Sequence, residues 1–123
     1  MSKGTPADRT DDLPNAELAM LHRRLVALVA NLDLAIDDAT DAAEVWVLTD
    51  QITAANVRVT AVGRVLFARQ SEDVTVAAAQ VVKSIADVEM ALSDLARLET
   101  FVSTMTGMLK LVDGAVATAR MAS

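Results

Sequence analysis

Residues 74–95, VTVAAAQVVKSIADVEMALSDL, decide the fold class of this chain. Apolar residues recur in this stretch at alternating steps of four and three, at Val74, Ala78, Val81, Ile85, Val88, Leu92 and Leu95. That spacing holds one apolar stripe on a single side of an α-helix, where it can pack against a partner helix. The stretch therefore predicts a long amphipathic helix.

Two earlier segments repeat the pattern. The first runs through Leu18, Leu21, Leu25, Leu28, Leu32 and Ala35, and the second through Val45, Leu48, Ile52, Ala55, Val59, Val62 and Leu66. Residues 57–62 (VRVTAV) also alternate as a strand would, but the helical spacing continues unbroken through them. We therefore predict an all-α fold, an antiparallel bundle of three long helices, or of four if the third one breaks, with coiled-coil-like packing.

The expected helix starts carry capping signals. Pro14 suits the first turn of the first helix, with Asp12 or Leu13 before it. The other two starts are marked by Asp41 with Glu44, and by Ser71 with Glu72 and Asp73. Short connections then remain near residues 39–40 and 70–71, and short connections make neighbouring helices antiparallel.

The third segment contains an irregularity. Two successive steps of three, Leu92 to Leu95 to Leu98, turn the apolar stripe part-way round the helix, and residues 100–107 (TFVSTMTG) favour a helix least. One architecture has a continuous or merely kinked helix of about 49 residues, roughly 70 Å long. The other has a break near residues 103–107, which closes a four-helix bundle. We expect the continuous helix, because the stripe resumes without a loop-like gap.

A continuous third helix would extend past its two shorter partners. The part beyond about Leu98 would then leave seven apolar residues uncovered, namely Phe101, Val102, Met105, Met108, Leu109, Val112 and Val116. Monomeric proteins rarely expose an apolar surface of that size. The sequence therefore predicts a homo-oligomer, most simply a dimer, with these residues at the interface.

Composition limits the range of functions. Hydrophobic residues make up 53% of the 123, which is enough for one packed domain; we expect it over residues 13–123, with a disordered tail over residues 1–12. The chain has no cysteine, which excludes disulfides and thiolate metal sites. The formal net charge of −6 disfavours a phosphate-binding surface, so we expect no nucleic-acid partner. We expect no secretory signal and no membrane-spanning stretch. A cytoplasmic location is our default expectation, and the lack of cysteine is equally compatible with a periplasm.

Few residues suggest chemistry. His22, the single histidine, has no nucleophile motif around it, so we interpret it as lying at the edge of the bundle. Five acids gather at the junction of the first two helices, at Asp33, Asp37, Asp38, Asp41 and Glu44, without the glycine and ligand spacing of a calcium loop. We therefore predict no catalytic residue, no metal site and no cofactor.

Two further patterns lie beside the apolar stripes. Arg58, Arg64 and Arg69 fall in an acid-free stretch, where we interpret them as a solvated face. Small and polar residues form a row at Thr49, Thr53, Asn56, Thr60 and Gly63, with Trp46 and Phe67 at its ends, and a second row at Thr100, Thr104, Gly107, Gly114 and Thr118. Each row is either a polar face toward solvent or a second packing face for another helix.

The sequence favours a non-catalytic role. The leading hypothesis is a self-associating helical module that acts as an adaptor, scaffold or regulatory subunit for another protein. The alternative is a small helical bundle that binds an apolar ligand or a lipid surface.

Overall fold

The computed structural model describes residues 13–122, which form four α-helices and no strand. The helices are α2 (Ala16–Asp37), α3 (Ala42–Gly63), α4 (Glu72–Leu92) and α5 (Leu98–Met121). The prediction of an all-α bundle is confirmed at this level. The tail predicted over residues 1–12 lies outside the described residues.

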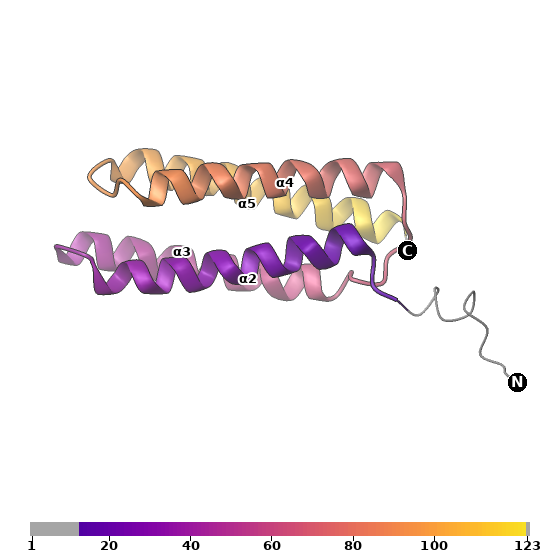
Figure 1. Ribbon diagram of the computed structural model, residues 1–123, viewed down its shortest axis with the longest axis horizontal. Coiled ribbons are helices and arrows are strands. Elements are labelled where there is room, and N and C mark those ends of the chain that lie inside the picture. The colour runs from indigo at the N-terminus through magenta and orange to yellow at the C-terminus, as the bar shows by residue number, and fades with distance from the viewer. Residues whose placement is uncertain (1–12, 123) are drawn as a thin grey trace, which may run out of the picture.

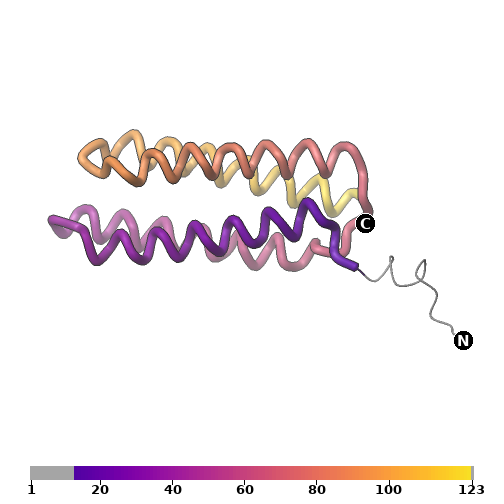
Figure 2. The backbone as a smooth tube through the Cα atoms, in the orientation of Figure 1, coloured from indigo at the N-terminus to yellow at the C-terminus, as the bar shows by residue number. Residues whose placement is uncertain are grey.

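The bundle is built from two helical hairpins (Figure 1). Helix α2 pairs antiparallel with α3, and α4 pairs antiparallel with α5. The hairpins then pack so that α2 lies beside α4 and α3 lies beside α5, each pair running parallel. The connection from α3 to α4 crosses one end of the bundle to the opposite corner (Figure 2). The predicted antiparallel arrangement therefore holds within each hairpin but not between them.

The third apolar segment is two helices, so the expectation of a continuous or kinked helix is wrong. The break lies at residues 93–97, ahead of the 103–107 stretch that we considered for it. Ser93 ends α4 and its hydroxyl donates to the Met90 carbonyl at 2.6 Å, a local bond that competes with helix continuation. The break coincides with the two successive steps of three, so that irregularity marked a turn.

Residues 103–107 are helical because α5 satisfies their polar groups locally. The hydroxyls of Thr104 and Thr106 donate to the Thr100 and Val102 carbonyls one turn earlier, at 2.8 and 2.9 Å. Met105, between them, is fully buried. Burial of this face outweighs the low helix propensity of the threonines, which is well under 1 kcal/mol per residue.

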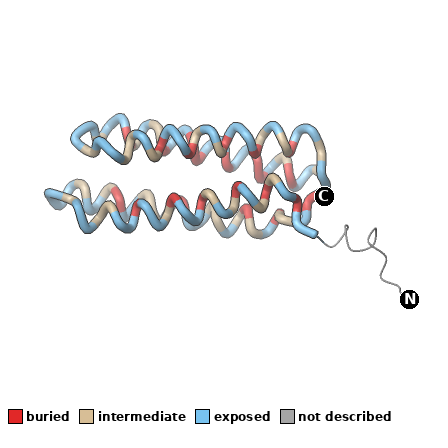
Figure 3. The backbone as a smooth tube through the Cα atoms, in the orientation of Figure 1, coloured by how far each residue is buried: buried red, intermediate tan, exposed pale blue. Residues whose placement is uncertain are grey.

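The core runs along the axis between the four helices (Figure 3). Helices α2 and α4 each bury five residues at helical spacing, and α5 buries eight. Helix α3 buries only Leu48, Ala55 and Val62, while Ile52 and Val59 of its predicted stripe are half-buried. Tertiary packing supplies most helix stability. Helix α3 therefore receives the least from this chain's own core.

The predicted caps of α3 and α4 are confirmed. The Asp41 carboxylate accepts from the Glu44 amide at 2.9 Å, and the Ser71 hydroxyl accepts from the Val74 amide at 3.1 Å. The start of α2 differs from the prediction, because Asn15 caps this helix and Pro14 precedes the cap. An asparagine at this position accepts the free amides of the first turn, which proline cannot do.

Asn15 also links α2 to the connection that follows α3. Its side-chain oxygen accepts from the Glu17 and Leu18 amides, and its side-chain nitrogen donates to the Ala68 and Arg69 carbonyls at 3.5 and 3.4 Å. Only 5% of Asn15 is exposed, so these bonds replace those it would make with water.

We expect Asn15→Ala to lower the free energy of unfolding by about 1–3 kcal/mol, since it removes a cap and leaves the buried Ala68 carbonyl without this donor. Asn15→Asp is the matched variant, because it keeps the cap acceptor and loses the donor. Chemical denaturation measures both. An Asp variant as stable as the parent chain would show that the bonds to residues 68 and 69 contribute nothing.

Candidate functional site

The seven residues predicted to form an uncovered interface lie along α5, against the rest of the chain. Six are buried in the core and Val102 is half-buried, so the expectation that they are left uncovered is wrong. The cause is the turn at residues 93–97, which folds α5 back along α4. The residues concerned are Phe101, Val102, Met105, Met108, Leu109, Val112 and Val116.

Helix α3 carries a second line of residues on the side opposite its buried stripe. We call it the outer row, and it consists of Trp46, Asp50, Thr53, Val57, Thr60, Arg64 and Phe67. All seven are exposed, and steps of four and three keep the first six on one side of the helix. Trp46 is 69% exposed, Val57 59% and Phe67, just beyond the helix, 66%. Two of the chain's three aromatic residues therefore face away from its core.

A shallow groove lies between the first two turns of α3 and α5. It has a volume of about 390 Å³ and is lined mainly by apolar side chains, with Val47 on α3 and Leu98 and Val102 on α5. Glu99 and Ser103 complete its lining. The contact between α3 and α5 is the least extensive of the four helix contacts, which leaves this groove accessible.

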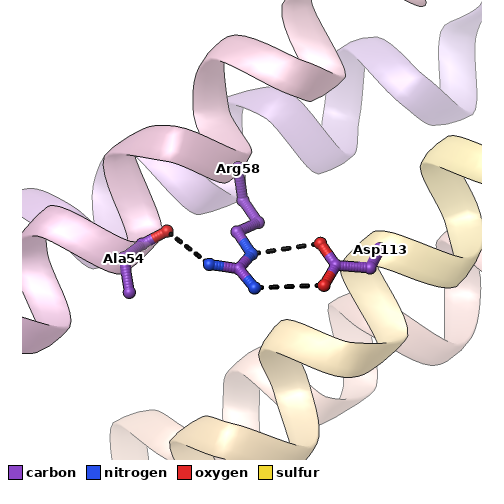
Figure 4. Close-up of polar contacts among 3 residues, drawn as sticks. All are labelled: Ala54, Arg58 and Asp113. Atoms are coloured by element: carbon purple, nitrogen blue, oxygen red, sulfur yellow. Dashed lines mark hydrogen bonds and ion pairs between the residues drawn. The ribbon is translucent and has the colours of Figure 1, made fainter.

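Farther along the same two helices an ion pair joins α3 to α5 (Figure 4). The Arg58 guanidinium donates to both carboxylate oxygens of Asp113 at 3.1 and 3.0 Å, and a third N–H donates to the Ala54 carbonyl at 3.3 Å. Such a two-point contact fixes geometry, although pairs this exposed contribute only about 0.2–1 kcal/mol. From the sequence we interpret Arg58 as part of a solvated face, and the structure adds that it is paired with Asp113.

The two rows of small polar residues are largely exposed, as in the first of the two readings. The hydroxyls of Thr49, Thr53, Thr104 and Thr118 each donate to the carbonyl four residues earlier in their own helix. A hydroxyl bonded in this way does not require water or another chain as its partner. The two rows therefore expose threonine methyl groups and backbone atoms, while these hydroxyl donors are already satisfied within their own helices.

Charge is divided along the bundle axis. The end that holds the two hairpin turns, residues 31–50 and 87–100, has Arg97 as its one base among the described residues. Its acids are Asp33, Asp37, Asp38, Asp41, Glu44, Asp50, Asp87, Glu89, Asp94 and Glu99. The rest of the described chain carries the other bases together with four acids, and one of these bases, Arg24, lies 3.5 Å from Glu89. The bases are Arg23, Arg24, Arg58, Arg64, Arg69, Lys83, Lys110 and Arg120, and the acids are Glu17, Glu72, Asp73 and Asp113. The hairpin end of the bundle is therefore strongly acidic, whereas the rest of the bundle has a modest excess of bases.

His22 lies against α3. A Cβ atom added to Gly63 would be 3.6 Å from the His22 side-chain Nε2, an ordinary contact distance. Within residues 13–122 the imidazole has no hydrogen-bond or ion-pair partner, and it is half-buried. A general base requires a carboxylate or water site in a defined position, and the surroundings of His22 supply no such carboxylate.

The acidic junction is spread over two helix ends. Asp41 and Glu44 take part in the start of α3, where the Thr40 hydroxyl donates to the Glu44 carboxylate at 2.6 Å. Among the described residues, no three His, Cys, Asp or Glu side chains lie close enough to hold a metal ion. Asp37 and Asp38 lie at the end of α2, where the helix dipole disfavours negative charge.

We expect the pair of substitutions Asp37→Asn and Asp38→Asn to leave stability unchanged or to raise it by about 0.3–1 kcal/mol at low salt. Thermal denaturation with added Ca²⁺ and with a chelator checks the same region, and we expect equal melting temperatures. A melting temperature that rises with Ca²⁺ only in the parent chain would contradict this prediction.

Sequence reasoning missed the groove between α3 and α5, because it placed Leu98 and Val102 on the stripe of one long helix and did not single out Val47. No helix within residues 13–122 is both long and apolar enough to cross a membrane.

Comparison with protein-family models, curated proteins and solved structures finds no match to this chain.

Proposed function

We propose that this protein is a non-catalytic helical module that binds another polypeptide through the outer row of α3, as an adaptor, scaffold or regulatory subunit. Trp46 is the observation that carries the proposal. It is the chain's one tryptophan, and 69% of it is exposed on a well-formed helix. Tryptophan is among the residues most enriched at the centres of protein interfaces, because its burial removes a large apolar area from water.

The weak burial of α3 supports the same role. Its outer row adds Val57 and Phe67 to the exposed apolar surface, while its inner stripe buries three residues. A partner helix laid along the outer row would supply the packing that α3 lacks. A helix that packs into such a face uses anchors at steps of three and four, which is the spacing of this row.

The chemistry of the side chains supports binding rather than catalysis. The one imidazole, His22, lies against Gly63 on the side of the bundle, and the acids at the hairpin end include the cap of α3.

A cytoplasmic location is part of the proposal, since a chain without cysteine needs no oxidising compartment.

Photo-crosslinking in living cells tests the proposal. A photoreactive residue replaces Val57 on the outer row, and the matched control replaces Val76, an equally small exposed valine on α4. We expect a covalent adduct with a polypeptide from position 57 and none from position 76. Absence of an adduct from position 57, or equal adducts from both positions, would refute the proposal.

The groove between α3 and α5 favours a second candidate function, binding of an apolar ligand. Val47, Leu98 and Val102 offer an apolar wall of the kind that a lipid chain or similar guest contacts. Titration with a fluorescent fatty acid tests this candidate, with Val102→Asp as the variant that should lose binding. Binding that this substitution leaves unchanged would exclude the groove as the site.

A further inference from the structure

The outer row of α3 reads almost the same from either end. Its order is aromatic, charged, threonine, valine, threonine, charged, aromatic, and the two charged residues have opposite signs. The row is centred on Val57, with Trp46 and Phe67 near-equally spaced on either side of it. We infer that the polypeptide bound at this row is a second copy of the same chain, with the two α3 helices antiparallel about a twofold axis at Val57. This inference rests on the proposed function and names its partner.

An antiparallel second copy matches the helical members of the row with suitable partners. Between Asp50 and Arg64, residue positions that face each other sum to 113 or 114, so the axial mismatch along the helix is at most about 1.5 Å, one residue rise. Val57 meets Val57 of the second copy, Thr53 meets Thr60 and Asp50 meets Arg64, and the end of the row that holds Trp46 lies toward the end that holds Phe67. A twofold interface must be complementary to itself, which this order satisfies.

The charged pair distinguishes a second copy from a chance apolar contact. Asp50 and Arg64 are both exposed, and within residues 13–122 neither has an ion-pair partner. They are about 21 Å apart along α3, too far to meet within one chain. An antiparallel copy brings them together twice, whereas a parallel copy would oppose Asp50 to Asp50 and Arg64 to Arg64. Charge complementarity of this kind selects the orientation.

The charge division along the bundle favours the same orientation. In a side-by-side antiparallel pair, the acidic hairpin end of one copy lies away from the acidic hairpin end of the other copy and beside the part that has an excess of bases. In a parallel pair, the two acidic ends would repel each other. The attraction acts over roughly a Debye length, about 8 Å at physiological salt, so added salt should weaken it.

The surface of the row suits a reversible contact. The Thr53 hydroxyl already donates to the Thr49 carbonyl at 3.2 Å, so water can leave without stranding this donor. Trp46 and Phe67 supply the large apolar areas at the two ends of the contact. The contact consists of one pair of helices of 22 residues each, about 33 Å long. A single helix pair buries less surface than most stable interfaces, so we expect its area to be at the lower end of their range. We therefore expect a dissociation constant of about 1–100 µM.

Charge exchange between the two positions tests the inference on the full chain. Asp50→Arg leaves two bases in the row and Arg64→Asp leaves two acids, so we expect each single variant to dimerise about tenfold more weakly than the parent chain. An equimolar mixture of the two variants restores both opposite-charge pairs. We expect the mixture to associate within about threefold of the parent affinity. Sedimentation equilibrium measures the association, and melting curves confirm that each variant is folded.

Trp46 reports the contact directly, because the chain has no other tryptophan. Its emission should shift to shorter wavelength as the concentration rises through the dissociation constant, and Val57→Lys should abolish the shift. Val76→Lys on α4 is the matched control that should preserve it. A parent chain that stays monomeric at 1 mM, or single variants and a mixture that associate equally, would overturn the inference. In that case, an adduct between position 57 and a different protein would still support the proposed function, although the bound polypeptide would not be a second copy of this chain.

Discussion

Replacing Phe101 with alanine is expected to lower the free energy of unfolding by about 3–5 kcal/mol, the usual cost of removing a buried aromatic side chain. Phe101 is fully buried in the first turns of α5, and it is one of the largest side chains in the core. Total stabilities of single domains are about 5–15 kcal/mol, so this one change removes a large share. Denaturant unfolding at a low protein concentration measures the effect.

The chain supplies a matched control, because its only other phenylalanine, Phe67, is 66% exposed. At a concentration where the protein is monomeric, we expect Phe67→Ala to change stability by less than about 0.5 kcal/mol. Equal effects of the two substitutions would mean that α5 does not pack in the chain's own core. A concentration-dependent effect of Phe101→Ala alone would mean that its contacts lie between copies.

The fold class could be predicted because helical spacing is a local property. The stripes through α2 and α4 coincide with the buried residues Leu25, Leu28 and Ile85, and the caps at Asp41 and Ser71 begin helices at the predicted places. Each of these signals depends on residues within one or two turns of one another. Propensity, capping and patterning agree there, and such agreement is what specifies a fold.

The position of the break could not be predicted from propensity. Thr104 and Gly107 weaken a helix locally, yet they lie inside α5, because burial of Met105 and Phe101 on the same helix outweighs them. Residues 93–97 carry no proline or glycine, so only the shift in apolar spacing at Leu95 marked the turn. That shift is also typical of a kinked helix, and only the packing of α5 on α4 decides between them.

Because the third helix was predicted to be continuous, the interaction surface was predicted on α5. A continuous helix would leave the α5 residues exposed, and the turn buries them. The same folding leaves Trp46 and Val57 as large apolar side chains on the outside of α3, a helix whose predicted stripe is only partly buried. Which of two stripes on one helix faces the core depends on contacts distant in sequence. The sequence placed Trp46, Thr53, Thr60 and Phe67 in one row, but neither the membership of Val57 nor the exposure of the row was predicted.

The largest effect is expected from a chain that ends at Leu98. It keeps only the first residue of α5. It therefore lacks the eight buried residues of this helix, among them Met108, Val112 and Ala119. The apolar side chains of α4 that faced α5 would then be exposed to water, at about 25 cal/mol for each Å². We expect this chain to lose cooperative thermal unfolding and to aggregate, as judged by circular dichroism and light scattering.

A chain that ends at Arg120 is the control for this truncation. It lacks Met121, which is 86% exposed, and the two residues after it, while every buried residue of α5 remains. We expect it to unfold cooperatively within about 1 kcal/mol of the full chain, the cost of a frayed final turn. If the chain ending at Leu98 also unfolded cooperatively and stayed monodisperse, α2, α3 and α4 would form a complete domain. Helix α5 would then be an appendage, and its eight buried residues would have to find their packing outside this subunit.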